Sequence, residues 1–126
     1  MLRKIDCVMV RVEDVSAAAD YYVRVFGLRR LWADSEGSHT SVGLGLPEAD
    51  AEVVVHDDPG IPGPVNVHYL VDDVRHACGE LARAGCRLHS GPLEIAIGWC
   101  AVLEDPFGTT LCVLDMSKGP RSTSEE

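Results

Sequence analysis

Cysteine and histidine are the residues of this sequence with the widest chemical range. The chain has five of each: Cys7, Cys78, Cys86, Cys100 and Cys112, and His39, His56, His68, His76 and His89. A thiolate is a nucleophile or a ligand for soft metal ions, and an imidazole is an acid, a base or a metal ligand near neutral pH. The cysteines form no Cys-x-x-Cys pair. We therefore expect reduced thiols in a cytoplasmic protein, without a disulfide framework or a zinc knuckle.

An internal repeat predicts the elements that position these residues. Val12-Glu13-Asp14-Val15 recurs as Val71-Asp72-Asp73-Val74. Each copy ends a short alternating apolar segment typical of a strand, and each precedes an amphipathic helical pattern. The expected helix ends also match, with N-cap aspartates and following glycines at Asp14, Asp73, Gly27 and Gly85.

Three further apolar runs follow each helical pattern, separated by turn residues. In the first half they cover about residues 28–33, 40–46 and 51–56, and in the second half about 86–89, 95–104 and 110–115. The pattern predicts an α+β fold of two βαβββ repeats. These would form a curved mixed β-sheet cup with the helices on its outer face.

The domain organisation follows from the same pattern. Residues 1–117 are expected to form a single domain, with repeat one at about 3–57 and repeat two at about 64–116. The stretch 57–64, rich in proline and glycine, is the predicted linker, and residues 118–126 are the predicted flexible tail.

The charge of the chain excludes several partners. Its 20 acidic residues outnumber 11 basic ones, for a formal net charge of -9 over 126 residues. This charge repels phosphate backbones and anionic lipids, so we expect neither nucleic acid nor membrane as a partner. The apolar runs are too short to cross a bilayer, and the first residues lack the apolar segment of a secretion signal.

Two segments resemble a known superfamily. Residues 5–14 are similar to the first strand and helix start of glyoxalase, bleomycin-resistance and extradiol dioxygenase domains, the vicinal oxygen chelate superfamily. Asp105-Pro106-Phe107-Gly108-Thr109 resembles the turn before the last strand of that fold. The resemblance covers residues 3–116. It implies a homodimer whose cups bind small molecules.

The resemblance also implies metal positions on the first and last strands of each repeat. Carried over, they are Cys7 and Asn66 on the first strands, and Val54 and Cys112 on the last strands. Hard divalent ions prefer oxygen and imidazole ligands, so this set predicts no metal and no other cofactor. Two thiolates could hold zinc or copper(I) if a third donor joined them. The alternative is that both cysteines are small buried apolar residues.

Strand alternation predicts which side chains face the cup. The expected ligand-binding residues are Cys7, Met9, Arg11, Val54, Asn66, His68, Trp99 and Cys112. His68 and His56 are the candidate catalytic acids or bases, or else histidines of the wall held by neighbouring groups. Trp32 and Trp99 offer stacking surfaces or fill the core, and Arg11 binds an anionic ligand group or pairs with an acidic residue.

These observations favour a protein that sequesters an apolar or aromatic small molecule in a dimeric cup, without metal. One alternative is an enzyme of the same superfamily. It would be a metal-dependent lyase, isomerase or dioxygenase, or a catalyst of metal-free proton transfer through a histidine. Another alternative is an accessory dimer whose cup is filled by its own side chains.

Overall fold

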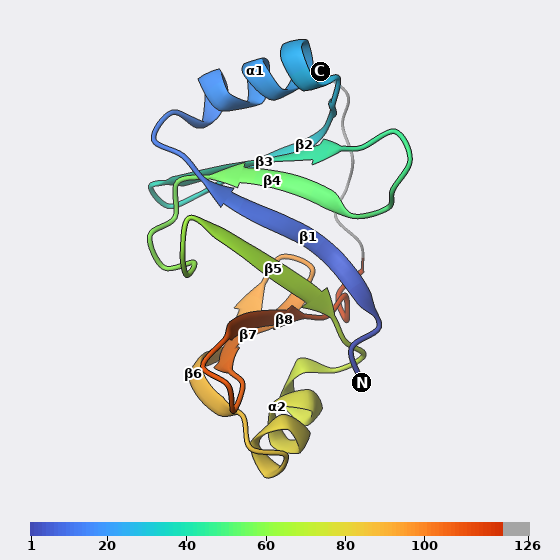
Figure 1. Cartoon of the computed structure of the whole chain (residues 1–126), viewed down its shortest axis with the longest axis vertical. Coiled ribbons are helices and arrows are strands. Elements are labelled where there is room, and N and C mark those ends of the chain that lie inside the picture. Colours follow the sequence, from blue (N-terminus) through green and yellow to red (C-terminus); the bar gives the residue numbers. More distant parts are fainter. Residues whose placement is uncertain (120–126) are drawn as a thin grey trace. The chain divides into compact units, whose positions relative to one another are not determined.

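A computed structural model describes residues 1–119. Figure 1 shows that a strand, a helix and three strands follow one another twice along the chain. The elements are β1 (Lys4–Arg11), α1 (Val15–Phe26), β2 (Arg29–Glu36), β3 (His39–Gly45), β4 (Glu52–His56), β5 (Val65–Leu70), α2 (Val74–Arg83), β6 (Arg87–Ile95), β7 (Gly98–Glu104) and β8 (Thr110–Leu114). The two predicted βαβββ repeats are confirmed, with residues 57–64 between them.

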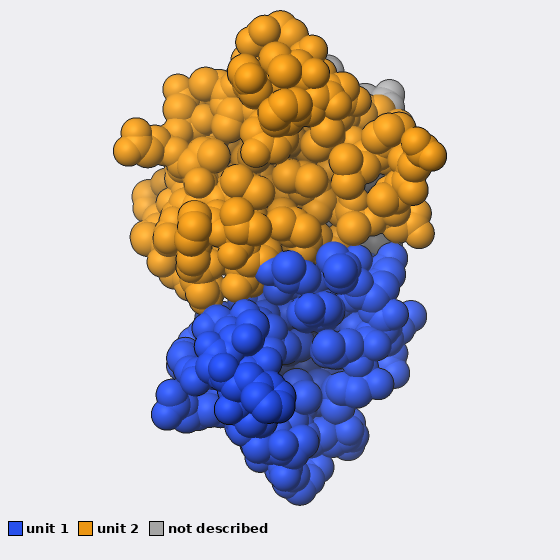
Figure 2. Space-filling view, in the orientation of Figure 1, with its two compact units in different colours: residues 1–5, 67–121 blue, residues 6–66, 122–126 orange. Residues whose placement is uncertain are grey.

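The chain divides into two compact units (Figure 2). Unit 2 comprises residues 6–66, and unit 1 comprises residues 1–5 together with the described residues from 67 onward. In unit 2 the strand order is β2-β3-β4-β1, with β1 parallel to β4 and the other neighbours antiparallel. In unit 1 the order is β5-β8-β7-β6, with β5 parallel to β8. The predicted α+β class with mixed β-sheet is confirmed.

Each helix packs on one face of its own sheet. In unit 2, Val15 and Ala19 of α1 form a core with Leu28, which precedes β2, and with the sheet residues Val42, Leu44 and Val55. In unit 1, Val74, Ala77 and Cys78 of α2 pack on Val71, Ala101, Leu103 and Val113. Leu44 and Leu103 are fully buried, and burial of a leucine side chain stabilises a fold by about 1.5–3 kcal/mol. In each unit, this core fixes the strands whose other face, away from the helix, is a candidate binding surface.

The helix ends follow the predicted capping chemistry. The Asp14 carboxylate accepts the N–H of Ala17 at 3.0 Å, and Asp73 accepts that of His76 at 3.2 Å. These bonds satisfy backbone donors that have no partner within the helix. Gly27 ends α1 with φ 76°, a left-handed conformation that glycine adopts without a Cβ clash.

The second half differs from the prediction at one turn. The sequence predicts a break at residues 90–92, whereas β6 continues through Gly91 to Ile95. Pairing with β7 persists because register shifts between Ser90 and Leu93 absorb the irregular backbone. The chain reverses instead between Ile95 and Gly98.

Two further predictions concern the chain as a whole. Residues 1–119 contain no helix with the length and apolar character needed to span a bilayer. Of the predicted tail, residues 120–126 lie outside the described part, while the Lys118 N–H donates to the Ile97 carbonyl at 2.9 Å. The assignment of residues 1–117 to a single domain stays a prediction.

Candidate functional site

The candidate site lies on the face of the unit 2 sheet opposite α1. Cys7, Met9, Trp32 and Val54 form a buried cluster there, which we call the apolar face. Met9 and Val54 are register partners on the parallel strands β1 and β4. Val10 packs with the α1 core, so the predicted alternation of β1 is confirmed.

Trp32 is fixed on this face by two neighbours. A Cβ added at Gly43 of β3 would lie 2.1 Å from the indole ring, so the ring occupies the space that any other residue would need. The indole Nε1–H donates to Glu52 Oε1 at 2.7 Å. Sequence reasoning missed Glu52, although its place two residues before Val54 puts it on the same face of β4.

Arg11 and His56 are register partners at one end of the apolar face. Arg11 Nη1 donates to the carbonyls of Pro59 and Ile61 at 3.4 and 3.3 Å. His56 is 2 % exposed, and its Nδ1 accepts the N–H of Asp58 at 3.0 Å. Among residues 1–119, Arg11 forms no ion pair with a carboxylate.

The environment of His56 keeps its imidazole neutral. Burial lowers the pKa of His56 below its ordinary value, because desolvation disfavours the charged form, and the Arg11 guanidinium lowers it further. The carboxylates of Asp58 and Asp57 act in the opposite direction without reversing the shift. Because Nδ1 accepts the Asp58 N–H, the neutral imidazole carries its own proton on Nε2, and Nδ1 can take a substrate proton only after the Asp58 N–H has left it.

The corresponding face of unit 1 is also apolar. Leu70, Ile97 and Leu114 form its buried cluster, with Cys100 packed against it. His68 and Cys112 are register partners on β5 and β8. Burial, with a smaller contribution from Cys100, raises the pKa of the Cys112 thiol to about 12. Without a metal ion, the Cys112 side chain is therefore a protonated thiol near neutral pH, and a protonated thiol is a poor nucleophile.

Two of the other predicted ligand-binding residues have distinct surroundings. Trp99 packs against the α2 core, with the guanidinium of Arg75 4.8 Å from its ring centroid. It therefore lies on the helix side of its sheet, away from the cluster of Leu70 and Leu114. Asn66 is 6 % exposed, and its Oδ1 is buried without a hydrogen-bond partner among the described residues.

The donors at the expected metal positions do not fit a hard divalent ion. Val54 has no donor atom, Cys112 is a neutral thiol, and the Cys7 thiol donates to Met9 Sδ at 3.6 Å. Asn66 contributes one amide oxygen. Within residues 1–119, no three His, Cys, Asp or Glu side chains gather in a way that could hold a metal ion. Apart from the Asn66 oxygen, the set supplies none of the oxygen and imidazole ligands that such ions need.

Comparison with known proteins identifies the family. The model of the Glyoxalase/Bleomycin resistance protein/Dioxygenase superfamily matches residues 4–113. The chain belongs to this superfamily. The resemblance inferred from residues 5–14 and from the Asp105–Thr109 turn is thereby confirmed. A comparison with curated protein sequences found no match.

Several solved structures share the fold of this chain at low sequence identity. A methylmalonyl-CoA epimerase variant from Streptomyces coelicolor, in complex with 2-nitronate-propionyl-CoA, has a TM-score of 0.77 and 13% identity, covering 93% of this chain and 99% of its own. The Mycobacterium tuberculosis methylmalonyl-CoA epimerase has a TM-score of 0.77 and 15% identity, with coverages of 92% and 89%. A hypothetical protein from Bacillus halodurans has a TM-score of 0.75 and 14% identity, with 98% of each chain covered. Identities this low indicate a common fold only.

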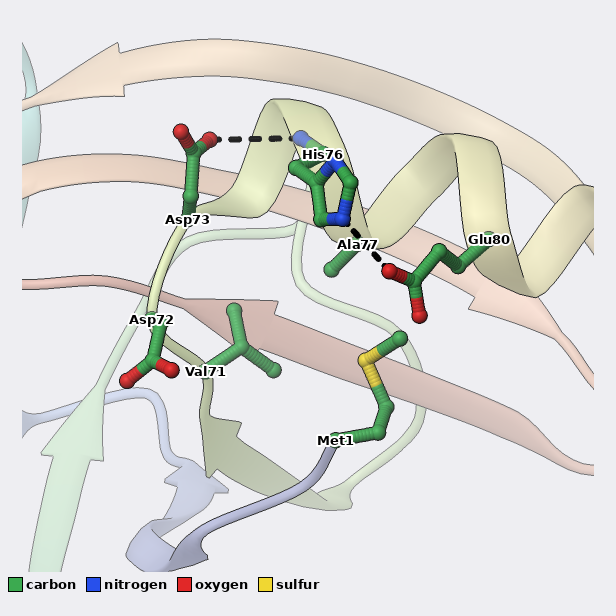
Figure 3. A pocket seen from close by; sticks show the side chains of 7 residues that line it. All are labelled: Met1, Val71, Asp72, Asp73, His76, Ala77 and Glu80. Carbon is green, nitrogen blue, oxygen red and sulfur yellow. Dashed lines mark hydrogen bonds and ion pairs between the residues drawn. The ribbon is translucent and has the colours of Figure 1, made fainter.

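A separate cavity of about 300 Å³ lies beside the start of α2 in unit 1 (Figure 3). The acidic residues and the histidine that line it already have partners. Asp73 caps the helix, His76 pairs with Glu80, and Asp72 pairs with Arg3 at 3.2 Å. None of the predicted site residues lines this cavity.

Proposed function

We propose that the protein binds a small apolar or aromatic molecule on the apolar face of unit 2, without a metal ion. The observation that carries this proposal is the fixed position of Trp32, whose ring lies against Gly43 and is held by Glu52. The Trp32 side chain is 8 % exposed, so a ligand reaches it only when the residues that cover it move aside. A preformed aromatic surface then binds a planar ligand at little cost in conformational entropy.

The neighbours of Trp32 suit the same class of ligand. Met9 contributes a polarizable thioether, which forms favourable contacts with aromatic rings and adapts to irregular shapes. Val54 provides a branched apolar surface where the resemblance would place a metal ligand. Arg11, at the end of this face, is suited to an anionic group on the ligand. Homodimerisation, which the resemblance implies, is part of this proposal.

The solved neighbours support a small-molecule site in general terms. One of them is a complex with 2-nitronate-propionyl-CoA, so this fold accommodates an organic ligand of that kind in that protein. For this chain we propose only the broader class, an apolar or aromatic small molecule.

A second candidate is proton transfer by His56. Its imidazole is 2 % exposed and neutral, and its Nδ1 would take a substrate proton once the Asp58 N–H that it now accepts has moved away. Arg11 lies beside it, and its cation could stabilise the anion that this transfer leaves on the substrate. Loss of turnover in His56→Gln, with ligand binding retained, would support an enzyme. Unchanged turnover in that variant would remove His56 as the base.

Binding is best followed at Met9 itself. With ¹³C-methyl-labelled methionine, the chain gives signals from Met1, Met9 and Met116. Titration with the planar aromatic probe 8-anilinonaphthalene-1-sulfonate should shift the Met9 signal and leave the other two in place. Trp32→Ala should weaken this binding, whereas Leu93→Ala, at an exposed site of unit 1, should not. A probe that shifts Met1 or Met116 but never Met9 would contradict the proposed location.

A further inference from the structure

The segment 57–64 crosses from β4 to β5 with its two ends fixed to the unit 2 sheet. At the start, the N–H of Thr40 donates to Asp57 Oδ1 at 2.8 Å, and the Asp57 N–H donates to the Thr40 carbonyl at 3.3 Å. At the end, the Arg11 N–H donates to the Pro64 carbonyl at 2.9 Å. These hydrogen bonds at the two ends do not depend on the middle of the segment.

The middle of the segment is held differently, by three side chains and one apolar contact. His39 Nε2 lies 3.8 Å from Asp58 Oδ1. His56 accepts the N–H of Asp58, and Arg11 binds the carbonyls of Pro59 and Ile61 at 3.4 and 3.3 Å. The Ile61 side chain packs against the cluster that we call the apolar face. Residues 58–63 can therefore leave the sheet without loss of any strand pairing.

From this arrangement we propose that residues 58–63 form a strap that covers the apolar face, and that an incoming ligand displaces Ile61. Ile61 takes part of the surface on which the proposed ligand would lie, so the closed strap and the bound ligand compete. This inference rests on the proposed function, because the competition concerns the same face. Besides binding an anionic group of the ligand, Arg11 would hold the strap closed through the carbonyls of Pro59 and Ile61 and would release them when the strap opens.

The composition of the strap is consistent with such a movement. It includes Gly60 and Gly63, the latter at φ 68°, and three prolines lie within residues 57–64. Proline limits the conformations available to the open segment, which lowers the entropy gained on opening. Glycine supplies the backbone freedom at which the segment can turn. The strap is thus suited to move between the closed conformation and a small number of open ones.

If a site is open in only a fraction of the molecules, its apparent Kd equals the Kd of the open state divided by that fraction. Replacement of Ile61 by serine removes the apolar contact that closes the strap. We expect Ile61→Ser to tighten the apparent Kd for 8-anilinonaphthalene-1-sulfonate at Met9 by at least about threefold. Leu46→Ser, which alters an exposed apolar residue in another loop of unit 2, is the matched control and should leave that Kd unchanged.

Hydrogen exchange tests the movement without a ligand. The Asp58 N–H should exchange faster than the N–H groups of Arg11 and Val12, which donate to the carbonyls of Pro64 and His56. Addition of the probe should accelerate exchange at Asp58 further, although ligand binding usually protects the groups around it.

The possible results distinguish a failure of the strap proposal from a failure of the proposed binding function. Equal exchange at Asp58, Arg11 and Val12 would overturn the strap, since the segment would then open only with the sheet. Weaker binding by Ile61→Ser, or slower exchange at Asp58 with the probe bound, would also overturn it and make Ile61 a wall of the site. Absence of any shift at Met9 in every variant would contradict the proposed function instead, and the ligand-free exchange would still decide whether the strap opens.

Discussion

The Asp115 carboxylate accepts the backbone N–H of Val74, the first residue of α2, with 2.8 Å between Oδ2 and N. Its other oxygen, Oδ1, accepts the N–H of Trp99 at 3.0 Å and the hydroxyl of Ser117 at 2.8 Å. One carboxylate, 1 % exposed, thus joins the end of β8 to the start of α2 and to β7. The first repeat has a matching bond: Asp57, directly after β4, accepts the N–H of Thr40 in β3, as Asp115 accepts that of Trp99 in β7.

Asp115→Ala should reduce the free energy of unfolding by at least about 2 kcal/mol, because each buried backbone donor left without a partner costs about 1–3 kcal/mol. Urea denaturation followed by circular dichroism measures this change. Asp72→Ala is the matched control, since the Asp72 carboxylate is exposed and pairs with Arg3 at the surface. It should change the free energy of unfolding by less than about 0.5 kcal/mol. Similar effects of the two substitutions would contradict the role of Asp115.

The pH dependence of this stabilisation follows from the pKa of Asp115. Desolvation acts to raise that pKa, but the hydrogen bonds from Val74, Ser117 and Trp99 outweigh it, and the net shift is downward. A carboxylate with a lowered pKa in the folded state stabilises the fold above its unfolded value of about 3.9, and this contribution is lost as pH falls through the folded value. The difference in stability between wild type and Asp115→Asn should therefore narrow between about pH 5 and pH 2. A constant difference over that range would show that the charge of Asp115 contributes nothing.

His56 should make the stability of the fold depend on pH in a higher range than Asp115 does. Its pKa is lowered in the folded state, chiefly by desolvation, so the unfolded chain binds the proton more readily. The stabilising effect of the neutral imidazole is complete above the unfolded pKa of about 6.5 and is lost as pH falls through the folded value. The wild type should lose thermal stability between about pH 7 and pH 5, and His56→Gln should lose less over this interval. Since His39 contacts Asp57 and Asp58, His39→Gln serves as a control for the other nearby imidazole. Parallel curves for wild type and His56→Gln would refute this account.

Gly43→Ala should destabilise unit 2 by about 1–3 kcal/mol, because the new methyl group would overlap the Trp32 ring. Gly45→Ala is the control, since its Cβ would lie 3.2–3.3 Å from the Leu31 side chain, a far smaller overlap than at Gly43. The double variant Gly43→Ala with Trp32→Leu should recover part of the lost stability relative to Trp32→Leu alone, which a double-mutant cycle measures. Additive effects would mean that Trp32 does not lie over Gly43.

Much of the fold could be predicted from local signals. The aspartate caps and the alternation of Cys7 and Met9 with Val10 depend on neighbouring residues only, and both were correctly inferred. The end of β6 was not predicted, because Gly91 and Pro92 are typical of a turn and only the pairing with β7 shows that the strand continues. The side of the sheet to which Trp99 belongs depends on the register of β7, which the sequence leaves open by one residue.

The candidate site was harder to predict than the fold. Placement of Val54 beside Met9 followed from strand parity, but the support of Trp32 by Gly43 and Glu52 depends on pairing among β2, β3 and β4. Nothing local in the sequence indicates that Ile61 of the linker lies on this face. Contacts between distant segments, rather than motifs, define the site.

The central claim is that the apolar face binds its ligand without a metal ion. The most direct test measures the metal content of protein purified without a histidine tag, by elemental mass spectrometry, together with the Kd at Met9 before and after dialysis against a chelator. We predict far less than one metal ion per chain and an unchanged Kd after chelation. Near-stoichiometric metal whose removal abolishes the Met9 shift would contradict the account and would favour a metalloenzyme with an unusual ligand set.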